Sequence, residues 1–468
     1  MTASALPSAP VLAAVCAVAL IAISALAWAM SRDPRAFPVL AVLALPFRLP
    51  TSADGRTVNL LLPLYAVVAA GAIVHLLPRL ARAWGTADGW RGRWRSRAYG
   101  PSRPPTALDW LLLATVLLYA LQSLYSSDLG KAAENLAFFY VPFGLLYLLL
   151  RDAPWTRQLM LVCLGVAVGL AVLFAAVGFV EYFRKSLFLN PKVVAANDYD
   201  NYFRVNSLFF DPSIYGRFLA IVMVAVTTAV LWARRRREQW VGAAVLGWLL
   251  LGLVTSFSQS SIAALLLGLA VLAAWRWDLR STIYVAAALA AIALVAVVAS
   301  PASLHFGLKG SGGSANNATS GRTKLISGGL KLFADSPLYG FGAGSFETEY
   351  KRHGGGAAQN ATSASHTIPV TVAAEQGVLG LGLYFALIAV AFLTLFRDAG
   401  RSPPRIAIAA CFAALVLHTW VYADFLEDPI AWTLLGIGVA LSASFAAPAA
   451  GEGKARSEPG VASLARSG

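Results

Sequence analysis

A single histidine stands where a long polar stretch gives way to an apolar run. His366 precedes Thr367 and Pro369, and a threonine followed by a proline in the first turn is a typical helix start. Histidine is the side chain best suited to accept a proton near neutral pH, so His366 is a candidate general base. A histidine at a helix start often has only a capping or interfacial role, and both interpretations stay open at this point.

Arginine is the second residue type with possible chemistry, and Arg322 opens the segment RTKLISGGLKLF. On a helical wheel Arg322 falls on the apolar side with Leu325 and Phe333, away from the lysines. A guanidinium withdrawn from water needs an anionic partner. The segment therefore predicts a short interfacial helix with an anion-binding arginine. The alternative is an arginine on a frayed first turn that extends its charged end into water.

A second polar segment, NDYDNYFRVNSLFFDPSIYGRFL, contains further candidates. Arg204 lies before an apolar run, and Asp211 followed by proline marks the start of the next helix. Arg217 lies in the first turns of that helix, close to Tyr215.

The elements that hold these residues follow from an unusually apolar composition. Of 468 residues, 58% are hydrophobic and 13% charged, whereas a soluble globular domain has about 25% charged residues. The 37 Lys and Arg against 23 Asp and Glu give a net charge of +14, but the basic residues stand in short breaks between apolar runs. Such a pattern orients helices in a membrane. We predict a polytopic membrane protein with no nucleic-acid partner.

About twelve apolar runs are long enough to cross a bilayer as helices. They are residues 10–30, 58–78, 107–125, 132–150, 157–182, 212–233, 239–256, 259–275, 281–300, 367–396, 404–422 and 429–447. A further run, 36–49, is shorter and interrupted by proline. Because backbone groups must be hydrogen-bonded within lipid, the predicted fold is all-α, a bundle of about 12–13 transmembrane helices. One long outer loop, 301–365, carries short helices.

Arginine-rich breaks predict the orientation. These breaks are 79–106, 151–157, 234–237, 276–280 and 397–405. They all fall on one side if the helices between them alternate, and that side is the cytoplasm. Segments 183–211 and 301–365 then lie outside, together with the candidate residues. The side of the N-terminus stays open, because it depends on whether 36–49 crosses the bilayer.

Three other patterns have simpler interpretations. Asp198 and Asp200 form a D-x-D, a spacing that can hold a metal ion and a nucleotide sugar, but nucleotide sugars are absent on the outer face, so solvated loop acids are favoured. The G-x-G-x-G pattern from Gly340 to Gly344 follows no strand, so we predict turn glycines and no nucleotide site. The three cysteines are far apart in apolar runs, which predicts small buried hydrophobic residues and neither a disulfide nor a metal site.

Four segments, in order, resemble the O-antigen ligase and O-antigen polymerase family of bacterial envelope glycosyltransferases. They are RVNSLFFDPSIYGRFLA, TSFSQSSIAALLLG, SGRTKLISGGLKLFADSPLYGFGAGSFETEY and SHTIPVTVAAEQGVLGLGLYFAL. The resemblance covers about Arg204 to Phe396, and the upstream helices agree only in number and hydropathy. One departure is the run from Ser258 to Ser261, where many members carry a Ser-Arg pair.

The resemblance implies an inverting, metal-independent membrane glycosyltransferase without a cofactor, acting in lipopolysaccharide biosynthesis. Such an enzyme moves a glycan from undecaprenyl diphosphate to an acceptor hydroxyl at the periplasmic face of the inner (cytoplasmic) membrane. His366 takes the place of the essential loop histidine, and Arg204 and Arg322 take the places of the essential outer arginines. Arg217 is a further expected diphosphate ligand. The supporting residues are Asp211, Tyr215 and Glu375. The implied partners are the lipid-linked donor, a lipid- or glycan-bearing acceptor and the bilayer.

This resemblance divides the chain into N-terminal transmembrane helices (1–203), a ligase-like core (204–447) and a tail (448–468). The tail is rich in alanine, glycine and serine, so we expect it to be disordered. Glu375 lies nine residues after His366, which places it on the other side of the helix. We expect it to orient a neighbouring helix through hydrogen bonds.

Two alternatives to a ligase remain. A polysaccharide polymerase shares the donor chemistry and differs only in the acceptor. A transporter or flippase belongs to another class and requires ionisable residues near the bilayer midplane. Apart from Glu375, the charged residues lie at the ends of the runs, which disfavours ion-coupled transport.

Overall fold

The computed structural model describes residues 9–53, 56–83, 103–189, 203–277, 284, 322–353, 365 and 367–444. Within these ranges the chain is a bundle of α-helices, and nine of them are long and apolar enough to cross a membrane. Two shorter apolar helices accompany them. The predicted all-α polytopic bundle is confirmed. The predicted span at 281–300 and the tail at 448–468 lie outside the described residues.

The N-terminal helices correspond to the first apolar runs. They are α1 (Ala9–Arg32), α2 (Ala36–Ala44), α3 (Leu62–Gly71), the π-helix η1 (Ala72–Leu76), α4 (Leu77–Ala83), α5 (Ala107–Ser123), α6 (Leu129–Asn135), the π-helix η3 (Leu136–Tyr140), α7 (Val141–Asp152) and α8 (Arg157–Arg184). The π-helices join their neighbours into continuous spans, Leu62–Ala81 and Leu129–Asp152. Each of these predicted runs therefore contains a helix that lies close to its expected bounds.

Residues 36–49 do not form a transmembrane helix. α2 has nine residues, too few for the hydrocarbon layer. It is followed by an antiparallel hairpin of β1 (Leu49–Ala53) and β2 (Arg56–Leu60), in which Leu49 pairs with Leu60. Prolines interrupt this part of the sequence and prevent a longer helix. The hairpin also shortens the predicted 58–78 span, which begins only at Leu62.

The C-terminal helices are α10 (Pro212–Leu231), α11 (Arg236–Thr255), α12 (Gln259–Arg276), α15 (Arg322–Asp335), α16 (Phe346–Arg352), α17 (Ile368–Phe396), the 3-10 helix η4 (Ala399–Arg401), α18 (Pro403–Val421) and α19 (Pro429–Ser444). The short helix predicted in the outer loop is present as α15. α17 begins after Thr367 with proline in its first turn, as predicted.

α10 is the centre of the bundle. In the most apolar 18-residue stretch of α10, 72% of the residues are buried, compared with 17% in the corresponding stretch of the neighbouring α11. Two glycines allow neighbouring helices to approach closely: a Cβ at Gly216 would lie 2.7 Å from Ser261 Oγ, and one at Gly268 would lie 2.5 Å from a methyl of Val224. α10 and α12 can therefore pack with little space between them.

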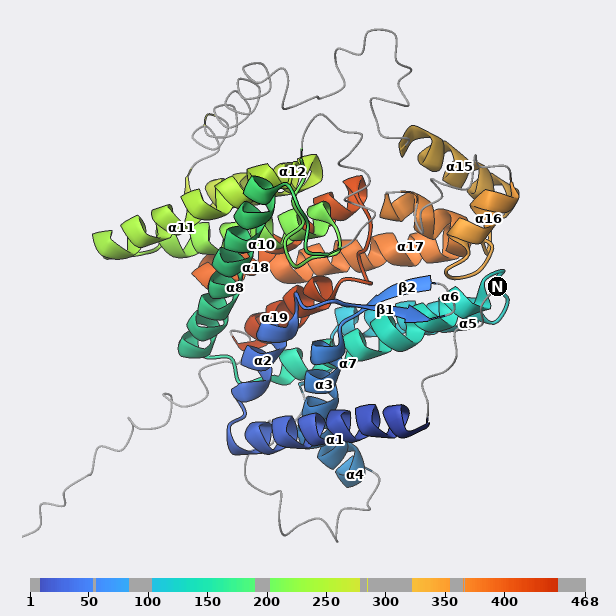
Figure 1. The fold of residues 1–468 in the computed structure, drawn as a ribbon, viewed down its shortest axis with the longest axis horizontal. Coiled ribbons are helices and arrows are strands. Elements are labelled where there is room, and N and C mark those ends of the chain that lie inside the picture. Colours follow the sequence, from blue (N-terminus) through green and yellow to red (C-terminus); the bar gives the residue numbers. More distant parts are fainter. Residues whose placement is uncertain are drawn as a thin grey trace, which may run out of the picture.

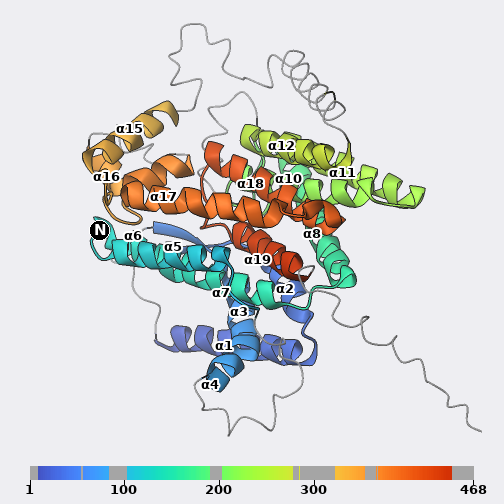
Figure 2. The ribbon, with the colours of Figure 1, turned by 180° about the vertical axis from the view of Figure 1, so that it is seen from behind.

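The helices form layers that both views display (Figures 1 and 2). α11 and α12 lie on one side of the α10–α18 pair, and α17 and α19 lie on the other. α5 and α7 follow, then α3, and α1 with α4 lies furthest from α12. α15 and α16 lie together beside the first turns of α17. The two helices of the outer loop are thus grouped near one end of α17.

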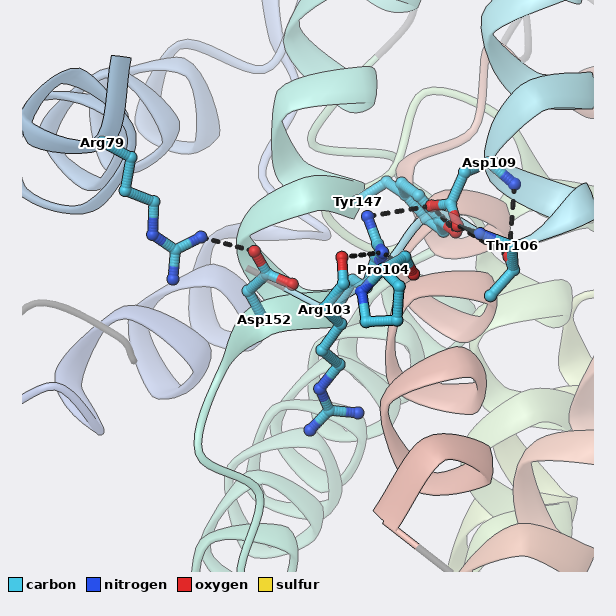
Figure 3. Close-up of polar contacts among 8 residues, drawn as sticks. Arg79, Arg103, Pro104, Thr106, Asp109, Tyr147 and Asp152 are labelled. Atoms are coloured by element: carbon cyan, nitrogen blue, oxygen red, sulfur yellow. Dashed lines mark hydrogen bonds and ion pairs between the residues drawn. The ribbon is translucent and has the colours of Figure 1, made fainter. Parts of the chain in front are cut away.

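Ion pairs hold the opposite, arginine-rich end of the bundle (Figure 3). Arg151 contacts Asp109 at 3.2 Å, and the Tyr147 hydroxyl donates to the same carboxylate at 2.8 Å. Arg79 pairs with Asp152. Arg151 also donates to two backbone carbonyls just before α5. These contacts tie α4, α5 and α7 together at one membrane face.

The turn between α1 and α2 lies at the same face as the start of α8. A cleft there is bordered by Asp33 and Arg35 of the turn, by Val39 of α2, and by Gln158 and Val162 of α8. α1 therefore begins at the opposite face. The end of α1 that carries Arg32 and the start of α8 that carries Arg157 therefore lie at one face.

Candidate functional site

Arg204 lies in a short segment that pairs with the end of α11. Its Nε donates to the carbonyl of Ser256 at 3.3 Å, and the backbone N–H of Val205 donates to the carbonyl of Thr255 at 3.2 Å. The Arg204 side chain is half-buried, whereas Val205 is fully buried. Arg204 is therefore held at the membrane end where α8 ends and α10 and α12 begin.

Arg217 has a different environment from Arg204. Its side chain is 0% exposed, and Nη2 lies 2.7 Å from Oδ2 of Asp428. Nη1 donates to the carbonyls of Ala423 at 3.2 Å and Asp424 at 3.1 Å. A buried charge with a paired carboxylate joins structural elements. These contacts favour a structural role for Arg217, and its diphosphate-binding role stays a prediction.

Asp211 and Tyr215 support the start of α10. Asp211 caps the helix by accepting a hydrogen bond from the N–H of Ser213 at 2.6 Å. The Tyr422 hydroxyl also bonds Asp211; burial and the nearby carboxylates raise the pKa of Tyr422 well above its ordinary value. Tyr215 is fully buried against Gly178 of α8 and Gly252 of α11, so it packs three helices together.

The loop from Val421 to Asp428, between α18 and α19, contains polar residues to which the sequence predictions assigned no role. Asp424 has a φ of 66°, a strained conformation for a residue other than glycine. Glu427 accepts a hydrogen bond from Asn135 Nδ2 at 3.1 Å. Burial, with the charge of Asp424, raises the pKa of Glu427 to about 7. The sequence feature that could have drawn attention to this loop is Asp428-Pro429 at the start of α19, because it resembles Asp211-Pro212 at the start of α10.

The glycine-rich segment packs into a break in α17. Gly340, Gly342 and Gly344 have φ values of 68°, 95° and 72°, so these are turn glycines, as predicted. α17 is interrupted at Gly377, where φ is 64° and ψ is −162°. A Cβ at Gly340 would overlap the backbone at Glu375, and one at Gly377 would overlap the carbonyl of Leu338. The two backbones are therefore in direct contact.

Glu375 fastens this segment to α17. Its Oε2 accepts a hydrogen bond from the N–H of Gly344 at 2.9 Å, and its Oε1 accepts one from Phe346 at 3.1 Å. The side chain is buried. Hydrogen bonds of backbone N–H groups to a carboxylate are stronger than neutral ones. Gly344 lies in the loop before α16 and Phe346 is the first residue of α16, so this geometry is consistent with the orienting role expected for Glu375.

α15 and α16 pack on the outer end of α17. Their shared apolar cluster consists of Leu325, Leu332, Phe346, Tyr350 and Ala374. Leu330, on the predicted apolar side, is 51% exposed. The glycine pair before it explains the difference: a Cβ at Gly328 would overlap Tyr350, and one at Gly329 would contact Val370. Arg322 is the first residue of α15, and its side chain lies outside the described residues.

His366 itself lies outside the described residues, but both of its neighbours are held. Ser365 Oγ donates to the carbonyl of Thr367 at 2.7 Å, and the Ser365 N–H donates to Thr371 Oγ1 at 3.0 Å. Thr367 Oγ1 donates to the carbonyl of Trp420 at 2.6 Å. Ser365 and Thr367 are thus attached to the outer ends of α17 and α18.

A cluster of serines surrounds a buried histidine between α12 and α18. His418 Nε2 lies 3.2 Å from both Ser260 Oγ and Ser261 Oγ. Ser258 caps α12 and lies 2.7 Å from Ser261 Oγ. The Ser-Arg pair of the resembling family is replaced here by a hydroxyl network. In the sequence, only the repeated serines indicate this network, because His418 lies on a helix that is distant along the chain.

The D-x-D pair and the three cysteines were the remaining candidates from the sequence. Asp198 and Asp200 lie outside the described residues. The cysteines are free: Cys16 is exposed, and Cys163 and Cys411 are buried. In the part of the chain that is described, no three His, Cys, Asp or Glu side chains gather as they would around a metal ion.

Residues 244–385 match the sequence profile of the O-antigen ligase family. The chain carries an O-antigen ligase domain. This domain includes most of α11, α12, the outer loop and the first half of α17. Arg322 and Glu375 fall inside the matched residues, whereas Arg204 and Arg217 precede them. No curated protein matches the chain. The matched region and the apolar helices agree with the multi-pass membrane protein of a glycosyltransferase-like family that the resemblance implied.

Proposed function

We propose that the protein is an O-antigen ligase that transfers a glycan from undecaprenyl diphosphate to a hydroxyl on a lipid-borne acceptor. The reaction takes place at the periplasmic face of the inner membrane. The observation that carries this proposal is the match of residues 244–385 to the O-antigen ligase profile, because the matched residues include Arg322 and His366. Arg204 precedes them, in the segment that is held at the end of α11.

The chemistry needs cationic groups at the leaving group. As the bond between the sugar anomeric carbon and the diphosphate oxygen breaks, negative charge grows on the diphosphate. Arg204 and Arg322 stabilise this charge, and loss of one such preorganised donor costs about 3 kcal/mol of barrier in other enzymes. In this proposal the two guanidiniums take the place of a metal ion.

His366 accepts the proton of the acceptor hydroxyl as that oxygen attacks the anomeric carbon. The attack comes from the face opposite the diphosphate, so the sugar configuration inverts in a single displacement. The proton goes to the imidazole and the bonding electrons go to the diphosphate. The hydrogen bonds of Ser365 and Thr367 support this role, because they restrict the backbone on both sides of His366.

The orientation belongs to the same proposal. The arginine-rich end with Arg79, Arg151 and Arg35 faces the cytoplasm, in line with the positive-inside rule. α15 and α16 then lie in the periplasm, and the start of α1 lies on that side as well. A donor carried by a polyprenyl chain reaches such a site from within the bilayer.

Ion-coupled transport has less support. Arg217 is paired with Asp428, and Glu375 has two backbone donors, so these buried groups have fixed partners and are not suited to carry protons or ions. A polymerase remains possible on the same donor chemistry, and the acceptor decides between the two.

The test is transfer by the purified full-length protein in nanodiscs. Undecaprenyl-diphosphate glycan is supplied with either a lipid A–core acceptor or a second lipid-linked glycan. We expect transfer to lipid A–core, abolished in His366→Ala and reduced at least about a hundredfold in Arg204→Ala or Arg322→Ala. Lys351→Ala, on the exposed face of α16, is the matched control. Extension of the second lipid-linked glycan alone would make the protein a polymerase, and wild-type rates in all three variants would refute the site.

A further inference from the structure

Glu181 is a buried acidic residue near the outer end of α8, and it was not among the residues predicted from sequence. Its side chain is 0% exposed. Oε2 accepts a hydrogen bond from the N–H of Ser207 at 2.7 Å, and Oε1 accepts one from the N–H of Phe188 at 3.0 Å. No cation lies within ion-pair distance among the described residues. Backbone donors therefore compensate its charge.

The two donors come from opposite ends of the outer segment between α8 and α10. Phe188 lies just after α8, and Ser207 lies just before α10, so one carboxylate joins both stems of this segment. Asn206 adds a second connection, because its Nδ2 donates to the carbonyls of Leu189 at 3.2 Å and Phe209 at 2.8 Å. The stems are thus fastened at their base.

Ser207 requires such support. Its φ is 51°, in the left-handed region that residues other than glycine rarely adopt. A strained backbone of this kind persists only when its surroundings hold it. The Glu181 carboxylate binds the N–H of Ser207, and the carbonyl of Phe174 on α8 accepts from its Oγ at 2.8 Å. Both contacts come from α8.

We propose that Glu181 is a positioning residue for Arg204. Arg204 lies three residues before Ser207, and its Nε donates to the carbonyl of Ser256 at the end of α11. Glu181 holds the stem just before α10, and this stem sets the position and direction of the Arg204 guanidinium, which binds the donor diphosphate. This assignment rests on the proposed function, since it needs Arg204 to be a diphosphate ligand.

A double-mutant cycle on ligand binding tests the proposal. The dissociation constant of undecaprenyl diphosphate, the leaving group itself, is measured for wild type, Glu181→Gln, Arg204→Ala and the double variant in nanodiscs. Glutamine keeps one acceptor oxygen but presents an amide N–H to the other backbone donor. We expect Glu181→Gln to weaken binding about tenfold or more, and to have no further effect in the Arg204→Ala background.

Control variants separate positioning from general loss of structure. Glu134→Gln removes an acidic side chain that pairs only with Lys131 in the described contacts, and it should bind like wild type. Asn206→Ala removes the second connection between the stems and should show the same dependence on Arg204. If Glu181→Gln folds poorly, Asn206→Ala still tests whether fastening the stems positions Arg204.

The outcomes are distinct. Equal weakening by Glu181→Gln with and without Arg204, or no weakening at all, overturns the positioning role and leaves the proposed function standing. If Arg204→Ala binds undecaprenyl diphosphate like wild type, Arg204 is not a diphosphate ligand. In that case both the site assignment and the role of Glu181 are overturned.

Discussion

Arg217 of α10 and Asp428, the residue before α19, form an ion pair inside the bundle, with 2.7 Å between Nη2 and Oδ2. Both side chains are almost completely buried. The pair joins the central helix to the loop after α18. Arg217 lies in the first turns of its helix, near the expected outer face, yet its guanidinium is paired with a carboxylate of the protein itself. Such a position in the sequence therefore does not by itself indicate that an arginine binds substrate.

Removal of one partner of this pair should destabilise the fold. We expect Arg217→Ala to lower the free energy of unfolding by about 3–5 kcal/mol, because the Asp428 charge is left buried without a partner. Denaturant unfolding in mixed micelles measures the effect. The double variant Arg217→Met with Asp428→Leu should recover most of the loss. A normal stability of Arg217→Ala with defective donor binding would instead support a substrate role.

The break in α17 should tolerate only glycine. At Gly377 the backbone lies in a region open almost exclusively to glycine, which costs another residue about 1–3 kcal/mol. A Cβ there would also overlap the carbonyl of Leu338. We expect Gly377→Ala to unfold at a lower temperature. Gly382→Ala, in the same helix with no neighbour within 4 Å, is the matched control and should be neutral or stabilising.

The charge of Glu427 should make stability depend on pH. Its pKa is raised from 4.5 to about 7, so between these values the folded protein binds more protons than the unfolded chain. Stability is then highest at the acidic end and falls as pH rises toward 7. Thermal unfolding between pH 4.5 and 8 measures this slope. Glu427→Gln should flatten it; an identical slope in that variant would contradict the assignment.

The proposed orientation can be tested by cysteine labelling. In a background without Cys16, Cys163 and Cys411, we expect Lys351→Cys to react with a membrane-impermeant maleimide from the periplasmic side. Arg35→Cys, in the turn between α1 and α2, should react only after the membrane is permeabilised. The reverse pattern would place α15 and α16 in the cytoplasm and exclude a periplasmic site.

Hydropathy predicts the spans well because lipid requires long apolar helices, and those helices are visible in the sequence. It fails at residues 36–60, where proline and the Asp54-Gly55 dipeptide are typical of a hairpin. The short run there resembled a weak span. The turn glycines at 340–344 were predictable from their spacing, since only glycine allows those backbone angles at no cost.

Partners across the bundle could not be predicted. Glu375 and Gly344 are separated by 31 residues, and Arg217 and Asp428 by more than 200. No local pattern specifies which distant group meets a buried charge. Glu181 was missed for the same reason, because its ligands are backbone N–H groups, which every residue except proline carries.

Two glutamates on different helices secure the two sides of the proposed site. Glu181 ties the Arg204 segment to α8, and Glu375 ties the loop after α15 to α17. In the proposed site, the distance that a diphosphate would bridge therefore depends on the relative placement of α8 and α17 in the lipid. A change of bilayer thickness or lateral pressure is then expected to alter the rate of the proposed transfer.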